Sequence, residues 1–145
     1  MKYYTKENFD PANSVGFALY RARNLVLGEM DTVLKDLDIT GQQMGVILSM
    51  SSNIASNPFE LSKLLDIDTG LMTRMLDKLE KLGILARVRS VEDRRMVNLE
   101  LTDKGHHVAA EIRMRAPEVL NKRLEGFSTE EFLEFRRLLA KFLGA

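Results

Sequence analysis

The stretch that decides the fold is residues 69–105, TGLMTRMLDKLEKLGILARVRSVEDRRMVNLELTDKG. Its first part carries apolar side chains at spacings of three and four, which predicts an amphipathic helix; the buried stripe is Leu71, Met72, Met75, Leu76, Leu79 and Leu82. Gly83 ends this helix, because glycine adopts a left-handed conformation without a Cβ penalty. The alternating runs 84–89 and 96–101 then predict a β-hairpin.

A short helix is expected just before this stretch. Asn57, Pro58 and Glu60 supply a capping side chain, a proline at the first helical position and a glutamate three residues after the cap. The segment 66–68 ends the helix after two turns, and Asp68 can cap the next one. Short helix, turn and longer helix make a helix-turn-helix, and the hairpin makes it the winged version.

Apolar faces on both sides of this unit predict further helices. Residues 15–37 form about six turns, and Thr40 with Gln43 forms a capping box for a helix through residue 50. The fold class is therefore mostly α with a small β-hairpin wing (α+β). We expect one domain over 1–145, with the winged helix-turn-helix at 40–101.

Two further helices follow the hairpin. The first is opened by Thr102 and is expected to break or kink at Pro117, where proline removes a backbone donor. The last begins with a capping box at residues 128–131 and a Phe127/Phe132 hydrophobic staple. Because the helices at 11–38 and 102–145 lie outside the compact unit, a monomer would leave their apolar stripes wet, which favours a homodimer. The alternative is that they cover the monomer's own core.

Composition limits the function classes. With 145 residues and 45% hydrophobic content, the chain suits a single domain. It has no apolar run of about 18 residues and its start lacks the apolar core of a signal peptide, so we expect a cytoplasmic protein with no membrane partner. The absence of cysteine excludes disulfides, thiolate metal sites and a cysteine nucleophile.

Charge is unevenly distributed along the chain. The formal net charge is zero, yet residues 69–95 contain seven basic and four acidic side chains, a balance of +3. A local positive face can collect phosphates by releasing their counterions, so binding to a nucleic acid should weaken steeply with salt. Ordinary solvated charges are the alternative.

At this point the residues resemble the MarR family of bacterial transcriptional regulators. The resemblance spans nearly the whole chain and is most specific at Thr73-Arg74, at LEKLGIL (79–85), at Asp93-x-Arg95 and at the following L-x-L-T-x-x-G (99–105). It implies a homodimer that binds double-stranded DNA at a pseudo-palindromic operator as a repressor. It also implies release by a small aromatic or phenolic anion.

The expected DNA contacts lie on two elements. Thr69, Thr73, Arg74 and Lys78 occupy the exposed face of the recognition helix, with Arg74 suited to a bidentate contact with guanine. The resemblance implies that Arg95 enters the minor groove and that Asp93 holds its guanidinium, although a plain surface ion pair is the alternative. Since side chains alternate along a hairpin, we expect Arg94 to point elsewhere, towards a phosphate.

The expected ligand contacts rest only on the adjacency of elements; they are Tyr20, Arg21, Met44, Leu48 and Arg113. Tyr20 and Arg21 suit the dimer interface equally well. No cofactor or metal is expected: His106 and His107 are adjacent and point about 100° apart on a helix. Asp103, His107 and Glu111 share a face, and although this is a conceivable half of a zinc site, such a pattern is more typical of a solvated helix.

The two other function classes are an enzyme and a protein-docking module. An enzyme is not expected, because no nucleophile, base and carboxylate constellation or phosphate-binding glycine loop is present. A winged-helix module that docks proteins without a DNA target is the rival. Such a surface would favour aromatic residues over the arginine and lysine of the recognition helix.

Overall fold

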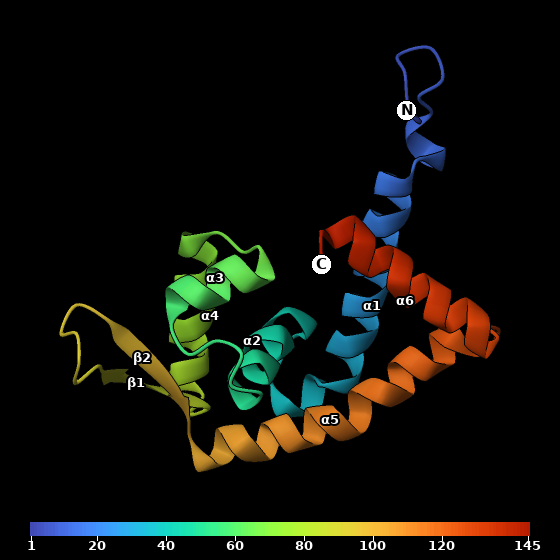
Figure 1. The fold of residues 1–145 in the computed structure, drawn as a ribbon. Helices are drawn as coiled ribbons and strands as arrows, with labels where there is room; N and C mark the ends of the chain where they lie inside the picture. The colour runs from blue at the N-terminus through green and yellow to red at the C-terminus, as the bar shows by residue number, and fades with distance from the viewer.

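The structure of the protein is a computed structural model that describes residues 1–145. It contains six α-helices and one antiparallel hairpin (Figure 1). The elements are α1 (Val15–Val33), α2 (Gly41–Ser51), α3 (Pro58–Leu65), α4 (Thr69–Lys81), β1 (Leu85–Arg89), β2 (Val97–Leu101), α5 (Asp103–Leu124) and α6 (Thr129–Leu143), with 3-10 turns at Pro11–Asn13 and Lys35–Leu37. The predicted fold class, mostly helical with a small wing, is confirmed.

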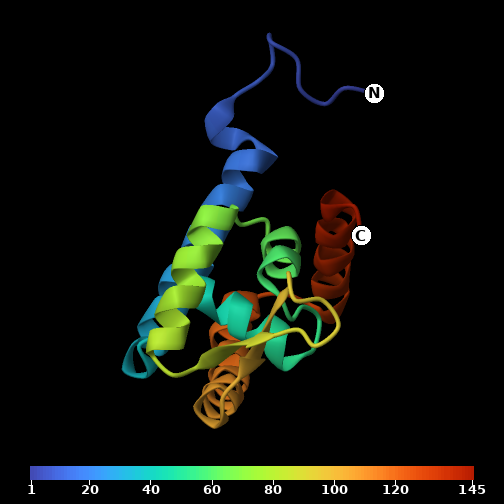
Figure 2. The same ribbon diagram turned by 90° about the vertical axis from the view of Figure 1, so that its left-hand side faces the viewer.

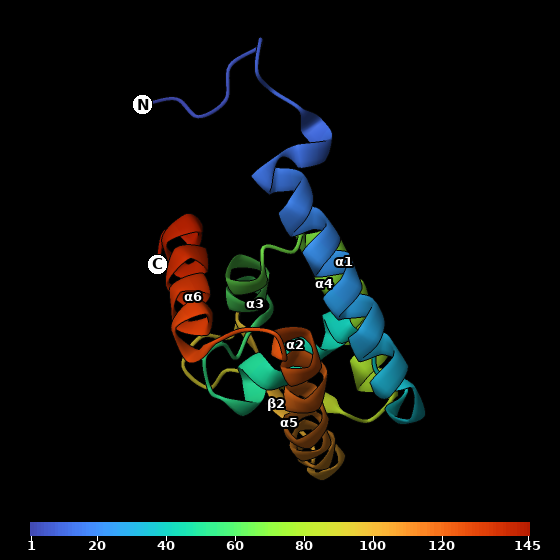
Figure 3. The same cartoon turned by 90° about the vertical axis from the view of Figure 1, so that its right-hand side faces the viewer.

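The elements separate into two ends that α5 connects. The hairpin, α3 and α4 form one end, and α1 with α6 forms the other, while α5 runs beneath both (Figure 1). Viewed from the side of α6 and α1, these two helices stand apart as separate arms (Figure 3). The structure thus places the helix-turn-helix and the terminal helices at opposite ends.

One hydrophobic core holds the hairpin end to the middle of the chain. The inner face of α4 packs with α2 and α5, and the cluster includes Leu76, Ile47 and Ile112, all with 0% exposure. The stripe expected for α4 is confirmed at Met72, Met75, Leu76 and Leu79, which are buried, whereas Leu71 and Leu82 are half-buried. None of the helices combines the length and apolarity needed to span a bilayer.

Two helices differ from expectation. The first ends at Val33 and is followed by the Lys35–Leu37 3-10 turn, which Asp38 ends in a left-handed conformation at φ 56°. The predicted break at Pro117 does not occur, since α5 runs through it as one helix, and the alternative of a kink stays a prediction. Residues of α5 before and after Pro117 bind the end of α1 and the turn that follows it. Arg115 binds Asp36 and the carbonyl of Val33, and Arg123 binds Glu29.

The capping boxes at Thr40/Gln43 and Ser128/Glu131 are both present. The hydrophobic staple of the last helix differs from prediction. Phe127 packs on Phe135, with ring centroids 5.8 Å apart, whereas the ring of Phe132 carries the guanidinium of Arg136 at 5.7 Å. Phe135 faces the groove between α6 and α1, which gives Phe127 an apolar neighbour there.

The junction between the helix-turn-helix, the hairpin and α5 is built around Thr102. Its hydroxyl donates to the carbonyls of Gly83 and Ile84, and its backbone N–H also donates to the carbonyl of Ile84. The hydroxyl oxygen accepts the N–H of Gly105. A Cβ on Gly105 would overlap the carbonyl oxygen of Ile84. Position 105 therefore requires glycine, because the main chain of Ile84 lies where a Cβ would be.

Gly105→Ala should destabilise the protein, because the clash is with backbone rather than with a flexible side chain. We expect the free energy of unfolding to fall by about 1–3 kcal/mol, the usual cost of overpacking. Urea or thermal unfolding at fixed protein concentration measures it. Gly28→Ala is the matched control: no atom lies within 4 Å of its added Cβ, and a helical alanine should add about 0.5–1 kcal/mol. Equal stability of the two variants would contradict this account of the junction.

Candidate nucleic-acid interface

The helix-turn-helix is fixed by side-chain caps. The Asn57 carboxamide oxygen accepts the N–H of Glu60 at 2.9 Å, and Asp68 accepts the N–H of Leu71 at 2.9 Å. Between them Asp66 ends α3 in a left-handed conformation, φ 52°. The carboxylate of Glu60 accepts the N–H of Ser56, one residue before the predicted cap. Both predicted helix starts are confirmed.

The outer face of α4 presents polar groups to solvent. Thr69, Thr73, Arg74 and Lys78 are all exposed. The hydroxyl of Thr73 donates to the carbonyl of Thr69 at 2.8 Å, which leaves its lone pairs free to accept. Neither Arg74 nor Lys78 forms an ion pair with a carboxylate. Both cations are thus available to an anionic partner.

Arg87 of β1 joins the hairpin to α4. Its guanidinium contacts Asp77 at 2.6 Å and Glu80 at 2.8 Å, and its backbone N–H donates to Glu80 at 3.3 Å. Partial burial acts to lower the pKa of Arg87, but the hydrogen bonds to Asp77 and Glu80 outweigh it and raise the pKa. The two carboxylates in the C-terminal half of α4 therefore share one guanidinium within the molecule, which leaves a net charge of −1 on the trio.

Sequence reasoning counted Arg87 only as one of the basic residues and missed this role. Asp77 and Glu80 are three apart on α4, and Arg87 is the first basic residue of the following strand. Acidic residues one turn apart beside a basic strand were the available signal. With this trio set aside, residues 69–95 retain six basic and two acidic side chains.

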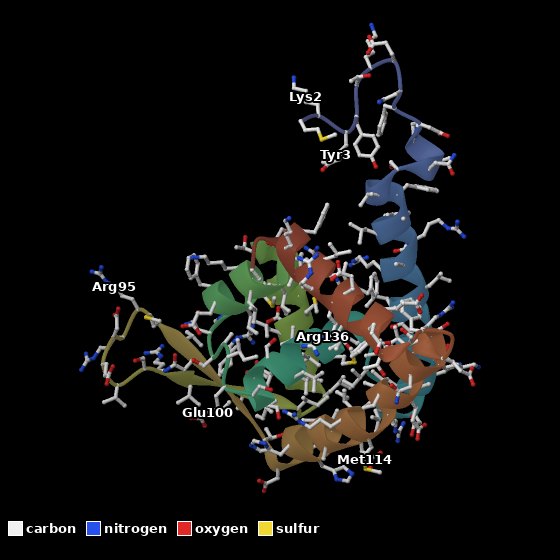
Figure 4. The ribbon with its side chains drawn as sticks, turned by 45° about the vertical axis from the view of Figure 1, so that its right-hand side comes forward. Lys2, Tyr3, Arg95, Glu100, Met114 and Arg136 are labelled. Atoms are coloured by element: carbon white, nitrogen blue, oxygen red, sulfur yellow. The ribbon has the colours of Figure 1, made fainter.

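The tip of the hairpin, residues 90–96, is a turn rather than continued strand. The strands pair from Leu85↔Leu101 to Arg89↔Val97, so Arg94 and Arg95 lie outside the ladder. The expectation that strand alternation separates their directions is therefore wrong. Both side chains are exposed and neither forms an ion pair; Figure 4 shows Arg95 projecting from the tip.

Asp93 shapes this turn through the backbone. Its carboxylate accepts the N–H of Arg95 at 3.0 Å, its carbonyl accepts the N–H of Met96, and its N–H donates to the hydroxyl of Ser90. The expected ion pair with the guanidinium of Arg95 is absent, because the carboxylate is used in an Asx turn. Asp93 thus sets the position of Arg95 by fixing its main chain.

The expected ligand residues do not converge. Tyr20 and Arg21 are exposed on α1, where Tyr20 stacks on Phe17 with centroids 6.3 Å apart. Met44 and Leu48 are half-buried on α2 against the core. Arg113 of α5 donates to the hydroxyls of Ser51 and Ser52 at 3.1 Å. Nor does Glu111 of the histidine trio stand free, since it pairs with Arg115.

Comparison with known proteins agrees with this geometry. The sequence profile described as MarR family matches residues 39–97. The chain is 31% identical over 115 residues to the multiple antibiotic resistance protein MarR of Escherichia coli K12, covering 79% of this chain and 80% of that one. It is 26% identical to the transcriptional repressor MdtR of Bacillus subtilis, covering 81% and 76%.

A solved structure shows the same arrangement. A variant of E. coli MarR in complex with operator DNA superposes with a TM-score of 0.76 at 28% identity, covering 93% of this chain and 99% of that one. The winged helix-turn-helix, the exposed cations on α4 and the hairpin, and the relation to E. coli MarR together identify the chain as a DNA-binding transcriptional regulator that belongs to the MarR family.

Proposed function

We propose that the protein is a homodimeric repressor that binds a pseudo-palindromic operator. The observation that carries the proposal is the set of four unpaired cations, Arg74 and Lys78 on α4 and Arg94 and Arg95 at the wing tip, on two elements that Arg87 ties together. The relation to an operator-bound MarR and to a protein named as a repressor supports it. Because its target is chromosomal DNA, the proposed place of action is the cytoplasm.

The dimer is supported by the apolar surface of the terminal helices. No residue of α6 is buried. Between α6 and α1 lies a groove of about 570 Å³ lined only by apolar side chains, which are Val15, Ala18, Leu19, Ala22, Phe135, Leu138, Leu139 and Phe142. Monomeric proteins rarely leave such a surface in water. A two-fold dimer would cover it and present two copies of α4, about one helical turn of DNA apart.

In the proposed complex the two elements read different grooves. The face of α4 with Thr69, Thr73, Arg74 and Lys78 enters the major groove, where Arg74 reads a guanine and Lys78 binds a phosphate. Arg95 enters the adjacent minor groove, where A·T-rich sequences attract a cation, and Arg94 binds a phosphate. The outer face of α4 offers no aromatic anchor, so the rival proposal of a protein-docking module lacks support.

An effector is the further part of the proposal and rests on family resemblance. A small aromatic or phenolic anion that binds between the terminal helices and the helix-turn-helix would change the separation of the two α4 helices. Such a ligand must bind the two states differently, with coupling of roughly 1–3 kcal/mol. Titrating aromatic acids into a preformed protein–DNA complex tests it, and release by none of a broad panel would contradict it.

The proposal as a whole is tested by gel shift on the DNA upstream of the chain's own gene. We expect a dimer to bind one site, with affinity that falls steeply between about 50 and 200 mM salt as phosphate-bound counterions are released. A scrambled duplex of the same composition is the control. Binding that ignores salt or sequence, or no binding at all, would contradict the proposal.

The two cations of α4 should behave differently. Arg74→Ala should cost about 1–3 kcal/mol of binding free energy and relax the preference at one base position of each half-site. Lys78→Ala should weaken binding to all sequences alike. Fluorescence anisotropy on a set of single-base operator variants separates these outcomes; a uniform loss for Arg74→Ala would reverse the two roles.

Arg87→Ala should weaken DNA binding although Arg87 itself is half-buried, because it leaves Asp77 and Glu80 as free negative charges beside phosphates. We expect a loss of about 1–2 kcal/mol at low salt. Adding Asp77→Asn and Glu80→Gln to that variant should restore part of the affinity. Arg89→Ala, on the same strand and with no ion pair, is the control for loss of a cation alone. Failure of the neutral pair to restore binding would show that Arg87 acts some other way.

A further inference from the structure

An apolar hollow lies between the start of α3 and the tip end of β2. It has a volume of about 290 Å³ and is lined by Asn57, Pro58, Phe59, Arg95, Met96 and Val97. Phe59 is 73% exposed, and Met96 and Val97 are 44% and 37% exposed. An aromatic ring this exposed, beside the arginine assigned to the minor groove, is not needed for the core and was not among the expected DNA contacts.

The two walls of this hollow are held at a fixed separation. The N–H of Leu99 in β2 donates to the carbonyl of Ser56 at 2.7 Å, which ties the wing to the residues just before α3. Ser56 is in turn bound to Glu60 at 3.0 Å, and Glu60 to Asn57 at 2.9 Å. The start of α3 and strand β2 are therefore held rigidly side by side.

The hollow lies on the face that carries the proposed DNA contacts. Viewed from the wing side, α3 stands beside α4, and the hairpin runs below both from the side of α4 towards α3 (Figure 2). When α4 lies in a major groove and the wing tip in the adjacent minor groove, one sugar–phosphate strand must pass between them, because one strand separates adjacent grooves. The surface opposite that strand is the start of α3 and the tip end of β2.

We propose that this hollow holds a deoxyribose of that strand, packed on the ring of Phe59 beside Arg95, whose guanidinium continues into the minor groove. The inference rests on the proposed function, since it assumes that α4 and the wing occupy adjacent grooves. The apolar walls suit the C–H face of the sugar, and the guanidinium of Arg95 suits the negative potential of the minor groove next to it. The occupant is thus a DNA strand, and Phe59 is a sequence-independent contact that sets the depth of the wing.

The same chemistry makes the site selective for DNA over RNA. A ribose would bring its 2′-hydroxyl against the apolar wall, where burial of a hydroxyl without a hydrogen-bond partner is unfavourable. Pro58 has no backbone N–H to offer, and Met96 and Val97 offer no polar side-chain atom. Against Pro58, Met96 and Val97 a hydroxyl would therefore lose its water without replacement; the polar side chains of the lining are Asn57 and Arg95.

Salt dependence distinguishes this contact from the basic ones. Phe59→Ala should weaken operator binding about tenfold, as expected for loss of apolar burial. It should leave the slope of log affinity against log salt unchanged, because no phosphate contact is lost. Arg95→Ala should reduce that slope by about 0.9. Met114→Ala is the control: Met114 is 70% exposed on α5, remote from the wing (Figure 4), and its truncation should change neither quantity.

A second measurement does not depend on affinity. The chain has no tryptophan, so Phe59→Trp supplies a single tryptophan at the hollow, whose emission is excited apart from that of the three tyrosines, and Met114→Trp is its control. Operator duplex should change the emission of the first variant and leave that of the second unaltered. If wild-type protein binds the duplex while Phe59→Ala binds equally well, or while the emission of the Phe59→Trp variant stays constant, the inference is overturned. If wild-type protein does not bind, the proposed function has failed instead.

Discussion

The rest of the structure depends on the junction where the hydroxyl of Thr102 bonds the carbonyls of Gly83 and Ile84. Four elements meet here: α4 ends, β1 begins, β2 ends and α5 starts. Gly105 allows the close approach because it has no Cβ, and Lys104 adds a hydrogen bond to the last turn of α4 through Leu82. The direction of the wing relative to α4 is therefore set at its root by backbone contacts, and Arg87 sets it again further out. A protein that must place two elements in adjacent grooves of a stiff duplex needs such fixed geometry.

Charge in this chain is organised by pairing rather than by net excess. Four arginines are bound to carboxylates and have raised pKa values: Arg87, Arg115, Arg123 and Arg137. For the last three the hydrogen bonds are the main cause. For Arg87 burial acts to lower the pKa, and the hydrogen bonds outweigh it. The pairs of Arg87, Arg115 and Arg123 hold different elements together, whereas that of Arg137 lies within α6. The unpaired arginines and lysine on α4 and the wing tip remain free for phosphates and bases. A formal net charge of zero is thus compatible with DNA binding, because structural and functional cations are separate sets.

Much of the fold could be predicted from the sequence, since caps and periodicity act locally. Asn57, Asp68 and Gly83 marked helix ends correctly, and the motif ending in Gly105 was recognised, although only the structure shows that the carbonyl of Ile84 is the reason for the glycine. Contacts between distant elements could not be predicted. Arg115 and Arg123 bind α5 to the end of α1, Asp93 binds backbone instead of the Arg95 guanidinium, and the N–H of Leu99 meets the carbonyl of Ser56. Residue patterns show which face of an element is buried, but not what it will meet.

The central claim is that α4 and the wing form one rigid unit that reads adjacent grooves of one duplex in each protomer of a dimer. Site-directed DNA cleavage tests it most directly, because the chain has no cysteine and a single introduced thiol carries the iron chelate without ambiguity. An Arg95→Cys conjugate should cut the minor groove flanking each half-site, and a Thr73→Cys conjugate should cut beside the major groove within it. The two patterns should be related by one dyad, with half-site centres about 10 base pairs apart. Cleavage from both positions in the same groove, or at one half-site only, would contradict the account.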